Sequence, residues 1–255
     1  MARRDAARSA LETADDLLHE SQRVIGSNLV AVILHGSVVS ADFVADRSDV
    51  DLLLIVRSPL AGKQRRSLAD AVTKLARQRR AWVDYRVVTS EQASRPPPAP
   101  TLDFYVGMHP DFPGGVEIEH TPTREPDLLF EFAICREEGV SLVGPAPTGL
   151  LGTVPNGWLL KVGDGYLKRW QEIEYEEQHA ELMVFTACRL WYRAVEGGHC
   201  SKSDAARWVG ARAPDLVAPK LALERRTTLA RPSIARADVM TLFSKVRGVL
   251  AAHMT

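Results

Sequence analysis

The chain has 255 residues, enough for one large domain or two domains of ordinary size, each with its own hydrophobic core. Hydrophobic residues make up 45% and charged residues 25% of the chain, as in ordinary globular proteins, and Lys and Arg balance Asp and Glu at 32 each. Because proteins that bind long nucleic acids usually carry a basic excess, the zero net charge argues against such a partner. It does not exclude a single nucleotide.

The cysteines and the N-terminal residues bear on the cellular compartment. Cys135, Cys188 and Cys200 are odd in number and far apart, so the sequence predicts neither a disulfide framework nor a CxxC metal site. The first residues contain acids before any apolar run reaches signal-peptide length, and no run approaches the roughly 18 apolar residues of a membrane span. We therefore expect a cytoplasmic, monomeric protein without a membrane segment.

The first part of the chain alternates between predicted helices and strands. Residues 4–24 place apolar side chains at helical spacing among charges, and residues 60–80 do the same with a basic outer face. Short β-rich apolar runs at 29–37, 49–56 and 81–88 are bounded by turn residues and predict strands. Helices and strands in this order predict an α/β (α+β) domain built on a small mixed sheet.

The composition changes after about residue 157. Before that point, residues 125–139 return to helical periodicity and a short strand is expected soon after them. Beyond it the strand-like runs end, and residues 180–198 are apolar on most faces and stop at a Gly pair, which predicts the central helix of an all-α bundle. We therefore expect two domains, 1–157 and 158–255.

Two aspartates open the predicted strand 49–56. Asp49 and Asp51 are two residues apart, so both carboxylates point to one face, roughly 6–7 Å apart. Two such charges repel by about 1 kcal/mol in water and by several kcal/mol in a shielded site. A divalent cation between them would reverse the sign, and Mg²⁺ is commonly held by one or two carboxylates plus substrate phosphates. A solvated strand end is the alternative interpretation of the pair.

The turn before this strand and the strand after it supply further candidates. Gly36 allows the backbone to approach a phosphate closely, and Ser37 offers a hydroxyl and an N–H, although a plain tight turn is the alternative. Asp84 interrupts the strand 81–88 and shares a polar face with Arg86. If that strand lies beside the aspartate pair, three carboxylates converge; otherwise it is a solvent-facing edge strand. His35 is expected to be packed or solvated rather than catalytic.

These motifs resemble those of a known superfamily. Residues 34–56, with a Gly-Ser turn followed by Asp-x-Asp at the start of the next strand, resemble the signature of the DNA polymerase β-like nucleotidyltransferases. Residues 136–147 and 185–208 resemble the corresponding parts of the aminoglycoside (3'')(9)-adenylyltransferases, which modify streptomycin and spectinomycin. The resemblance covers most of residues 28–210 and implies a nucleotidyltransferase domain followed by a helical bundle. It implies Mg²⁺-dependent transfer of AMP from ATP to a hydroxyl of a small cationic antibiotic, which would confer resistance.

The resemblance also implies roles for individual residues. Asp49 and Asp51 would hold two Mg²⁺ with the triphosphate, and Asp84 stands where the family commonly has a glutamate that acts as general base. The shorter side chain of Asp84 changes the reach of that base but not its chemistry. The residues expected to contact the nucleotide are Gly36, Ser37, Ser48, Arg189 and Lys202.

Two of these nucleotide contacts also have an argument of their own. The sequence Ser-Lys-Ser-Asp at 201–204 has the form of a capping box, which predicts Lys202 in the first turn of a helix. The helix dipole disfavours a cation there, so a bound anion would resolve the mismatch, and a solvated lysine is the alternative. Arg189 lies in the most apolar predicted helix and needs an anionic partner, either a phosphate or an internal glutamate.

An acidic segment at 170–181 is the candidate binding site for the acceptor. Carboxylates there would form charge-assisted hydrogen bonds with the ammonium groups of a polycationic substrate, although a solvated helix start is the alternative. The family's two substrate-binding aspartates align with Tyr175 and His179, which is a departure from its pattern. The residues expected to contact the substrate are Trp170, Glu174, Glu176, Glu177 and His179, with interdomain packing as the alternative role of Trp170.

Two other functions remain open on the sequence. The first is a nucleotidyltransferase that acts on a different acceptor, either a metabolite or a protein side chain, because an intact metal centre would accompany a changed acceptor pocket. The second is a nucleotide-binding module without turnover, which the aspartate at position 84 leaves open.

Overall fold

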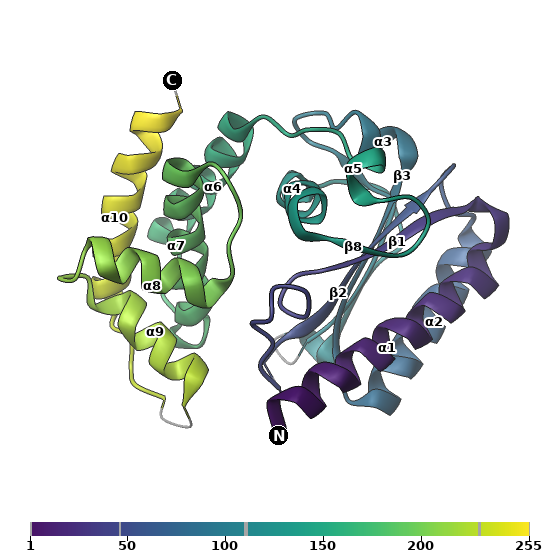
Figure 1. The fold of residues 1–255 in the computed structure, drawn as a ribbon, viewed down its shortest axis with the longest axis horizontal. Coiled ribbons are helices and arrows are strands. Elements are labelled where there is room, and N and C mark those ends of the chain that lie inside the picture. Colours follow the sequence, from purple (N-terminus) through teal and green to yellow (C-terminus); the bar gives the residue numbers. More distant parts are fainter. Residues whose placement is uncertain (1, 46, 110–111, 229–230, 255) are drawn as a thin grey trace. The chain divides into compact units, whose positions relative to one another are not determined.

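The computed structural model describes residues 2–45, 47–109, 112–228 and 231–254. The chain divides into two compact units, Met1–Val154 and Pro155–Thr255, whose elements are labelled in Figure 1. The boundary at residue 157 expected from the sequence falls in the first turn of α6 (Asn156–Glu172), the helix that opens the second unit.

A six-stranded mixed sheet forms the centre of the first unit, as the sequence predicts. Its strand order is β6-β5-β3-β2-β1-β8. The second and third strands of the chain pair in parallel, whereas the other pairings are antiparallel. In chain order the strands are β1 (Leu29–His35), β2 (Asp49–Val56), β3 (Trp82–Thr89), β5 (Phe104–Met108), β6 (Val116–Glu119) and β8 (Val140–Val143). A separate two-stranded sheet pairs β4 (Thr101–Leu102) with β7 (Thr123–Arg124).

Helices cover both faces of the large sheet. On one face lie α1 (Ala2–Ile25) and α2 (Gly62–Arg79), and on the other lies α4 (Leu128–Glu138) (Figure 1). Alternate strand residues feed these two layers, because successive side chains point to opposite faces. Leu52 and Leu54 of β2 pack toward α1 and α2, whereas Leu53 packs toward α4. The short helices of this unit are α3 (Ser90–Ser94), α5 (Pro147–Leu150), η1 (Gly26–Asn28) and η2 (Pro113–Gly115).

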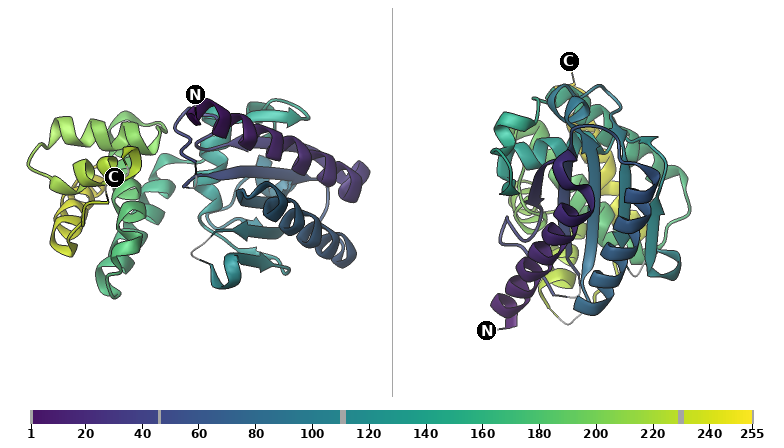
Figure 2. Two further views of the ribbon diagram at one scale, coloured as in Figure 1. Left: turned by 90° about the horizontal axis from the view of Figure 1, so that it is seen from below. Right: turned by 90° about the vertical axis from the view of Figure 1, so that its right-hand side faces the viewer.

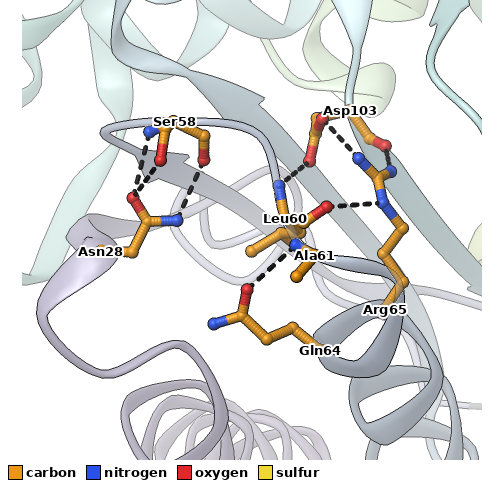
Figure 3. A network of polar contacts seen from close by, with 7 residues as sticks. All are labelled: Asn28, Ser58, Leu60, Ala61, Gln64, Arg65 and Asp103. Carbon is orange, nitrogen blue, oxygen red and sulfur yellow. Dashed lines mark hydrogen bonds and ion pairs between the residues drawn. The ribbon is translucent and has the colours of Figure 1, made fainter.

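A buried polar cluster fastens the start of α2 to the sheet (Figure 3). Arg65 and Asp103, only 7% and 3% exposed, pair through Nη2 and Oδ1 at 2.7 Å. The same guanidinium donates to the backbone carbonyls of Leu60 and Asp103, and Asp103 Oδ2 accepts the Leu60 N–H at 3.0 Å. Beside it, the Asn28 amide bonds both backbone groups of Ser58. Because each buried charge has several polar partners, the connection from β2 into α2 is held firmly. We call Leu60, Arg65 and Asp103 the α2 anchor.

The second unit is helical throughout the part that the structure describes, as predicted (Figure 2). Its central helix α7 (Ala180–Glu196) contacts all four of the longer helices around it. Gly163 allows α6 to approach α7 closely, because a Cβ there would lie 2.2 Å from a methyl carbon of Leu190. No helix of the described residues is long and apolar enough to cross a membrane. The remaining helices are α8 (Lys202–Arg212), α9 (Val217–Thr227), α10 (Arg236–His253) and the short η3 (Glu177–His179).

Candidate active site

A row of polar residues crosses the sheet at one end of β1, β2 and β3. His35 lies opposite Asp51, Asp51 lies beside Asp84, and Asp84 lies opposite Gly107 of β5. Residues at one ladder position project to the same face, so these side chains share the face that α4 covers. Asp49 shares it too, because it lies two residues before Asp51. We call Asp49, Asp51 and Asp84, with His35, the aspartate row. The strand of Asp84 thus lies beside the aspartate pair, the arrangement in which the sequence expects three carboxylates to converge.

The turn after β1 is pressed against this row. Gly36 has φ +70°, and a Cβ added to it would lie 2.0 Å from Asp51 Oδ2. Only glycine therefore fits, both because of its backbone conformation and because of the carboxylate beside it. The next residue, Ser37, has a hydroxyl that is buried without a hydrogen-bond partner among the described residues. Gly36 and Ser37 thus lie together with Asp51, and Ser37 Oγ has unused hydrogen-bonding capacity.

Asp84 makes a two-point ion pair with Arg86 on its own strand. Arg86 Nε lies 2.6 Å from Asp84 Oδ1, and Arg86 Nη2 lies 2.9 Å from Oδ2. Burial alone would raise the pKa of the Asp84 carboxyl, but the Arg86 guanidinium and hydrogen bonds from Arg86 and Tyr105 hold that pKa below its usual value. In the part of the chain described, no group of three or more His, Cys, Asp or Glu side chains is arranged to hold a metal ion. A cation in the row would therefore rest on Asp49 and Asp51, with Asp84 engaged by Arg86.

His35 is the buried residue at the β1 end of the aspartate row. Its Nε2 lies 3.5 Å from Glu131 Oε2 of α4, which is too long for a good hydrogen bond. Burial lowers the pKa of His35, although the charges of Glu131 and Asp84 oppose that shift. His35 is therefore neutral at pH 7, in line with the packed residue expected from the sequence. Glu131 was not among the predicted site residues, although a single acid between Phe130 and Phe132 in an apolar helix was a signal for it.

Ser48 lies apart from the row. It is buried, and its Oγ accepts the backbone N–H of Val44 at 3.1 Å. With Val50 it lines a cavity of about 140 Å³ beside α1. The hydroxyl thus closes the loop that leads into β2, and because it accepts this bond, its own O–H is still able to donate to a phosphate.

The two predicted nucleotide contacts of the second unit lie on neighbouring helices. Lys202 is the first residue of α8, and Ser201 caps that helix by accepting the Asp204 N–H at 3.1 Å. Ser201 is thus the N-cap and Lys202 lies in the first turn, as the sequence predicts, but Asp204 Oδ2 accepts the Ser201 hydroxyl at 2.8 Å instead of completing a capping box with the backbone. Arg189 is a half-buried residue of α7, which is otherwise largely apolar.

The predicted acceptor-binding residues have several internal partners. Trp170 of α6 stacks between Tyr166 and Phe243, with ring centroids 6.0 Å away on each side and planes inclined by 26°. It is half-buried and belongs to the packing of α6 against α10. Glu177 accepts from Arg225 of α9, whose Nη2 lies 3.2 Å from Oε1. Trp170 and Glu177 thus contribute to the helical packing within the second unit.

The rest of the acidic segment is more open. Glu176 accepts from the Gln178 amide at 2.8 Å and lies 3.6 Å from His179 Nδ1. Glu174 is exposed to solvent. The Tyr175 hydroxyl donates to the backbone carbonyl of Ile234, so this side chain ties the segment to the start of α10. Tyr175 thus has a structural role in this protein.

No protein-family model matches the chain. The aminoglycoside (3'')(9) adenylyltransferase of Klebsiella pneumoniae is 29% identical over 232 residues, which cover 87% of each chain. The spectinomycin 9-adenylyltransferase of Staphylococcus aureus is 28% identical over 193 residues, or 72% of each chain. The crystal structure of spectinomycin adenyltransferase AAD(9) from Enterococcus faecialis with ATP and spectinomycin has the same fold, with a TM-score of 0.76. The match covers 94% of this chain and 99% of that one, at 15% identity.

A mixed sheet that carries the Gly-Ser turn and the aspartate row, followed by a helical unit, defines a nucleotidyltransferase. The sequence matches extend over both units. Within this class, the chain is similar over most of its length to the aminoglycoside (3'')(9)-adenylyltransferases.

Proposed function

We propose that this enzyme transfers AMP from ATP to a hydroxyl of an aminoglycoside-type antibiotic such as streptomycin or spectinomycin, and thereby confers resistance. The observation that carries the proposal is the close contact between the Gly36 turn and Asp51 at the head of the aspartate row. The names of the relatives, and the ATP and spectinomycin bound to the AAD(9) enzyme of similar fold, support this acceptor class and ATP as the donor.

Asp49 and Asp51 have the right chemistry to hold two Mg²⁺. They present hard oxygen ligands from one strand, and Mg²⁺ bound by two carboxylates takes its remaining ligands from phosphates and water. Ser37, whose hydroxyl is buried without a described partner, is suited to donate to a phosphate oxygen. Bound Mg²⁺ would neutralise charge on the α-phosphate and on the departing pyrophosphate.

The chain's own residues then position the substrates and accept the proton. Gly36 lets the turn approach the triphosphate, and Asp84 accepts the proton of the attacking hydroxyl as that oxygen bonds to the α-phosphorus and pyrophosphate leaves. Arg189 and Lys202 are proposed to contact the triphosphate from the helical unit, and Glu174 and Glu176 to bind ammonium groups of the acceptor.

Release of pyrophosphate tests this function. Purified enzyme with ATP and Mg²⁺ is expected to release pyrophosphate when streptomycin or spectinomycin is added, and Asp51→Asn is expected to lower that rate by at least about 100-fold. Asp16→Asn is the matched control. It removes the carboxylate of an exposed ion pair between Asp16 of α1 and Arg79 of α2. Absence of release with any aminoglycoside would rule out the acceptor class.

A different acceptor is the second candidate. It is favoured by the internal engagement of Trp170, Tyr175 and Glu177, which leaves fewer groups for a polycationic drug. A screen of metabolites and protein acceptors for ATP-dependent pyrophosphate release distinguishes it from the drug assignment.

A binding module without turnover is the third candidate. It is favoured by the ion pair that engages both oxygens of Asp84. Calorimetric binding of ATP with Mg²⁺, without pyrophosphate release under any condition, would favour this candidate.

A further inference from the structure

Asp84 is held from two sides. Arg86 occupies one position on each carboxylate oxygen, at 2.6 and 2.9 Å, and the two side chains are only 17% and 19% exposed. The Tyr105 hydroxyl of β5 lies over Gly107, the residue opposite Asp84, where it is placed to donate to the same carboxylate and helps to lower the pKa of Asp84. Tyr105 is buried and lies directly opposite Arg86 in the β3–β5 pairing. The Arg86 guanidinium also lies 5.3 Å from the centroid of the Tyr105 ring, so the two residues that hold Asp84 pack on each other. We call Arg86 and Tyr105 the Asp84 clamp.

A missing side chain makes room for this clamp. Gly107 lies opposite Asp84 in the sheet, and a Cβ added there would lie 2.3 Å from the Tyr105 hydroxyl. The Tyr105 side chain therefore bends over Gly107 toward Asp84. Any other residue at position 107 would displace the hydroxyl, since no Cβ is tolerated at that distance. The contact between Tyr105 and Asp84 thus depends on the glycine.

The clamp limits what Asp84 is able to bind. A carboxylate offers about four acceptor positions. Arg86 fills two of them and Tyr105 fills a third, so one position remains. A carboxylate that is free to rotate would offer several orientations to an incoming hydroxyl, whereas Asp84 offers a single direction. Fixed orientation of this kind contributes strongly to catalysis.

We propose that Arg86 and Tyr105 are positioning residues that aim the one free acceptor position of Asp84 at the hydroxyl of the acceptor substrate. This inference rests on the proposed function, in which Asp84 takes that proton. The clamp touches neither substrate and acts through Asp84. Such a clamp suits an aspartate at position 84. The aspartate side chain is shorter than that of glutamate, so its carboxylate depends more on being held in the correct direction.

A set of variants tests the clamp. Arg86→Met and Tyr105→Phe are each expected to lower kcat for AMP transfer by roughly 10- to 100-fold, while the KM for ATP stays within about twofold of wild type. Arg86→Lys, which restores one charged donor, is expected to recover part of the loss. Gly107→Ala is expected to act like Tyr105→Phe, because the added methyl group displaces the hydroxyl. Arg79→Gln, at an exposed Arg–Asp pair elsewhere in the unit, is the control and keeps wild-type kcat.

Folding is checked separately through the thermal midpoint, and binding of an ATP analogue with Mg²⁺ is measured by calorimetry. Variants that bind the analogue normally and lose kcat support the clamp. If Asp84→Asn abolishes transfer but Arg86→Met and Tyr105→Phe transfer AMP at the wild-type rate, the clamp is overturned and the proposed function stands. If Asp84→Asn is as active as wild type, or if Glu131→Gln loses more activity than Asp84→Asn, the general base is a residue other than Asp84. The clamp is then overturned, and so is the role of Asp84 in the proposed function.

Discussion

The first unit contains two polar clusters built around an arginine and an aspartate, and they differ in the partners that hold the aspartate and in its burial. In the α2 anchor, Arg65 and Asp103 bond each other and also the backbone around them, and both are nearly inaccessible. In the aspartate row, Asp84 is held only by side chains, beside Asp51 and at the end of the strands. The anchor is buried away from any ligand, with Asp103 only 3% exposed, whereas the Asp84 side chain is 19% exposed. The same residue types thus form a deeply buried structural cluster in one place and a more accessible cluster beside Asp51 in the other.

The largest loss of stability is expected when the α2 anchor is broken. Asp103→Ala leaves the Arg65 charge buried without its carboxylate, which costs about 3–5 kcal/mol of unfolding free energy. Urea denaturation at pH 7 measures this loss, with Arg86→Met as the comparison variant in the open row. The comparison between the two clusters would break if both variants lost the same amount.

Next in size is the effect of a methyl group at the turn. Gly36→Ala combines a left-handed backbone conformation with overlap on Asp51 Oδ2, and is expected to cost about 1–3 kcal/mol and to weaken binding of ATP with Mg²⁺. Gly26→Ala is a matched control, because Gly26 has φ +63° but nothing within 4 Å of the added Cβ. Equal losses in the two variants would show that the contact with Asp51 contributes nothing.

A smaller effect is expected from pH. Burial lowers the pKa of His35, so below its ordinary value of about 6.5 the unfolded chain takes up a proton that the folded chain does not. The contribution of neutral His35 is therefore complete above that pH and is lost as the pH falls, by at most about 1.4 kcal/mol per pH unit. Urea denaturation between pH 5 and 7.5 in EDTA is expected to show a steeper decline for wild type than for His35→Gln. If the unfolding free energies of wild type and His35→Gln declined in parallel with pH, His35 would not be buried in its neutral form.

The smallest effect is expected at the exposed pair of Arg79 and Asp16, whose side chains are 36% and 39% exposed. Arg79→Gln is expected to change the unfolding free energy by less than about 0.5 kcal/mol, because exposed ion pairs are screened by water. A thermal melt measures it. A loss comparable to that of Asp103→Ala would mean that burial does not decide the strength of these pairs.

The sequence predicts β1, β2 and β3 well because each is a long apolar run with turn residues at its ends. It does not predict β5 and β6, which are short and flank an irregular stretch rich in Pro and Gly. Tyr105 was missed for the same reason, since its strand was not expected. The shared face of Asp84 and Arg86 follows from the two-residue period of a strand.

The side-chain partners in these clusters are harder to derive from sequence. The sequence indicates that Arg86 is near Asp84, but the way the guanidinium closes on both oxygens depends on Tyr105 from another strand. The internal roles of Trp170 and Tyr175 depend on Phe243 and Ile234, which lie far along the chain. Only the tertiary structure brings such partners together, and the local periodicity of the sequence does not predict them.

The parallel pairing of β2 and β3 has a consequence for how the protein is made. Parallel neighbours cannot be joined by a hairpin, so Asp51 and Asp84 become neighbours only after the connection through α2 has formed and returned to the sheet. A nascent chain that ends before β3 carries the Gly36 turn, Asp49 and Asp51 but lacks Asp84. The three carboxylates of the aspartate row therefore come together only once β3 has been made and has paired with β2.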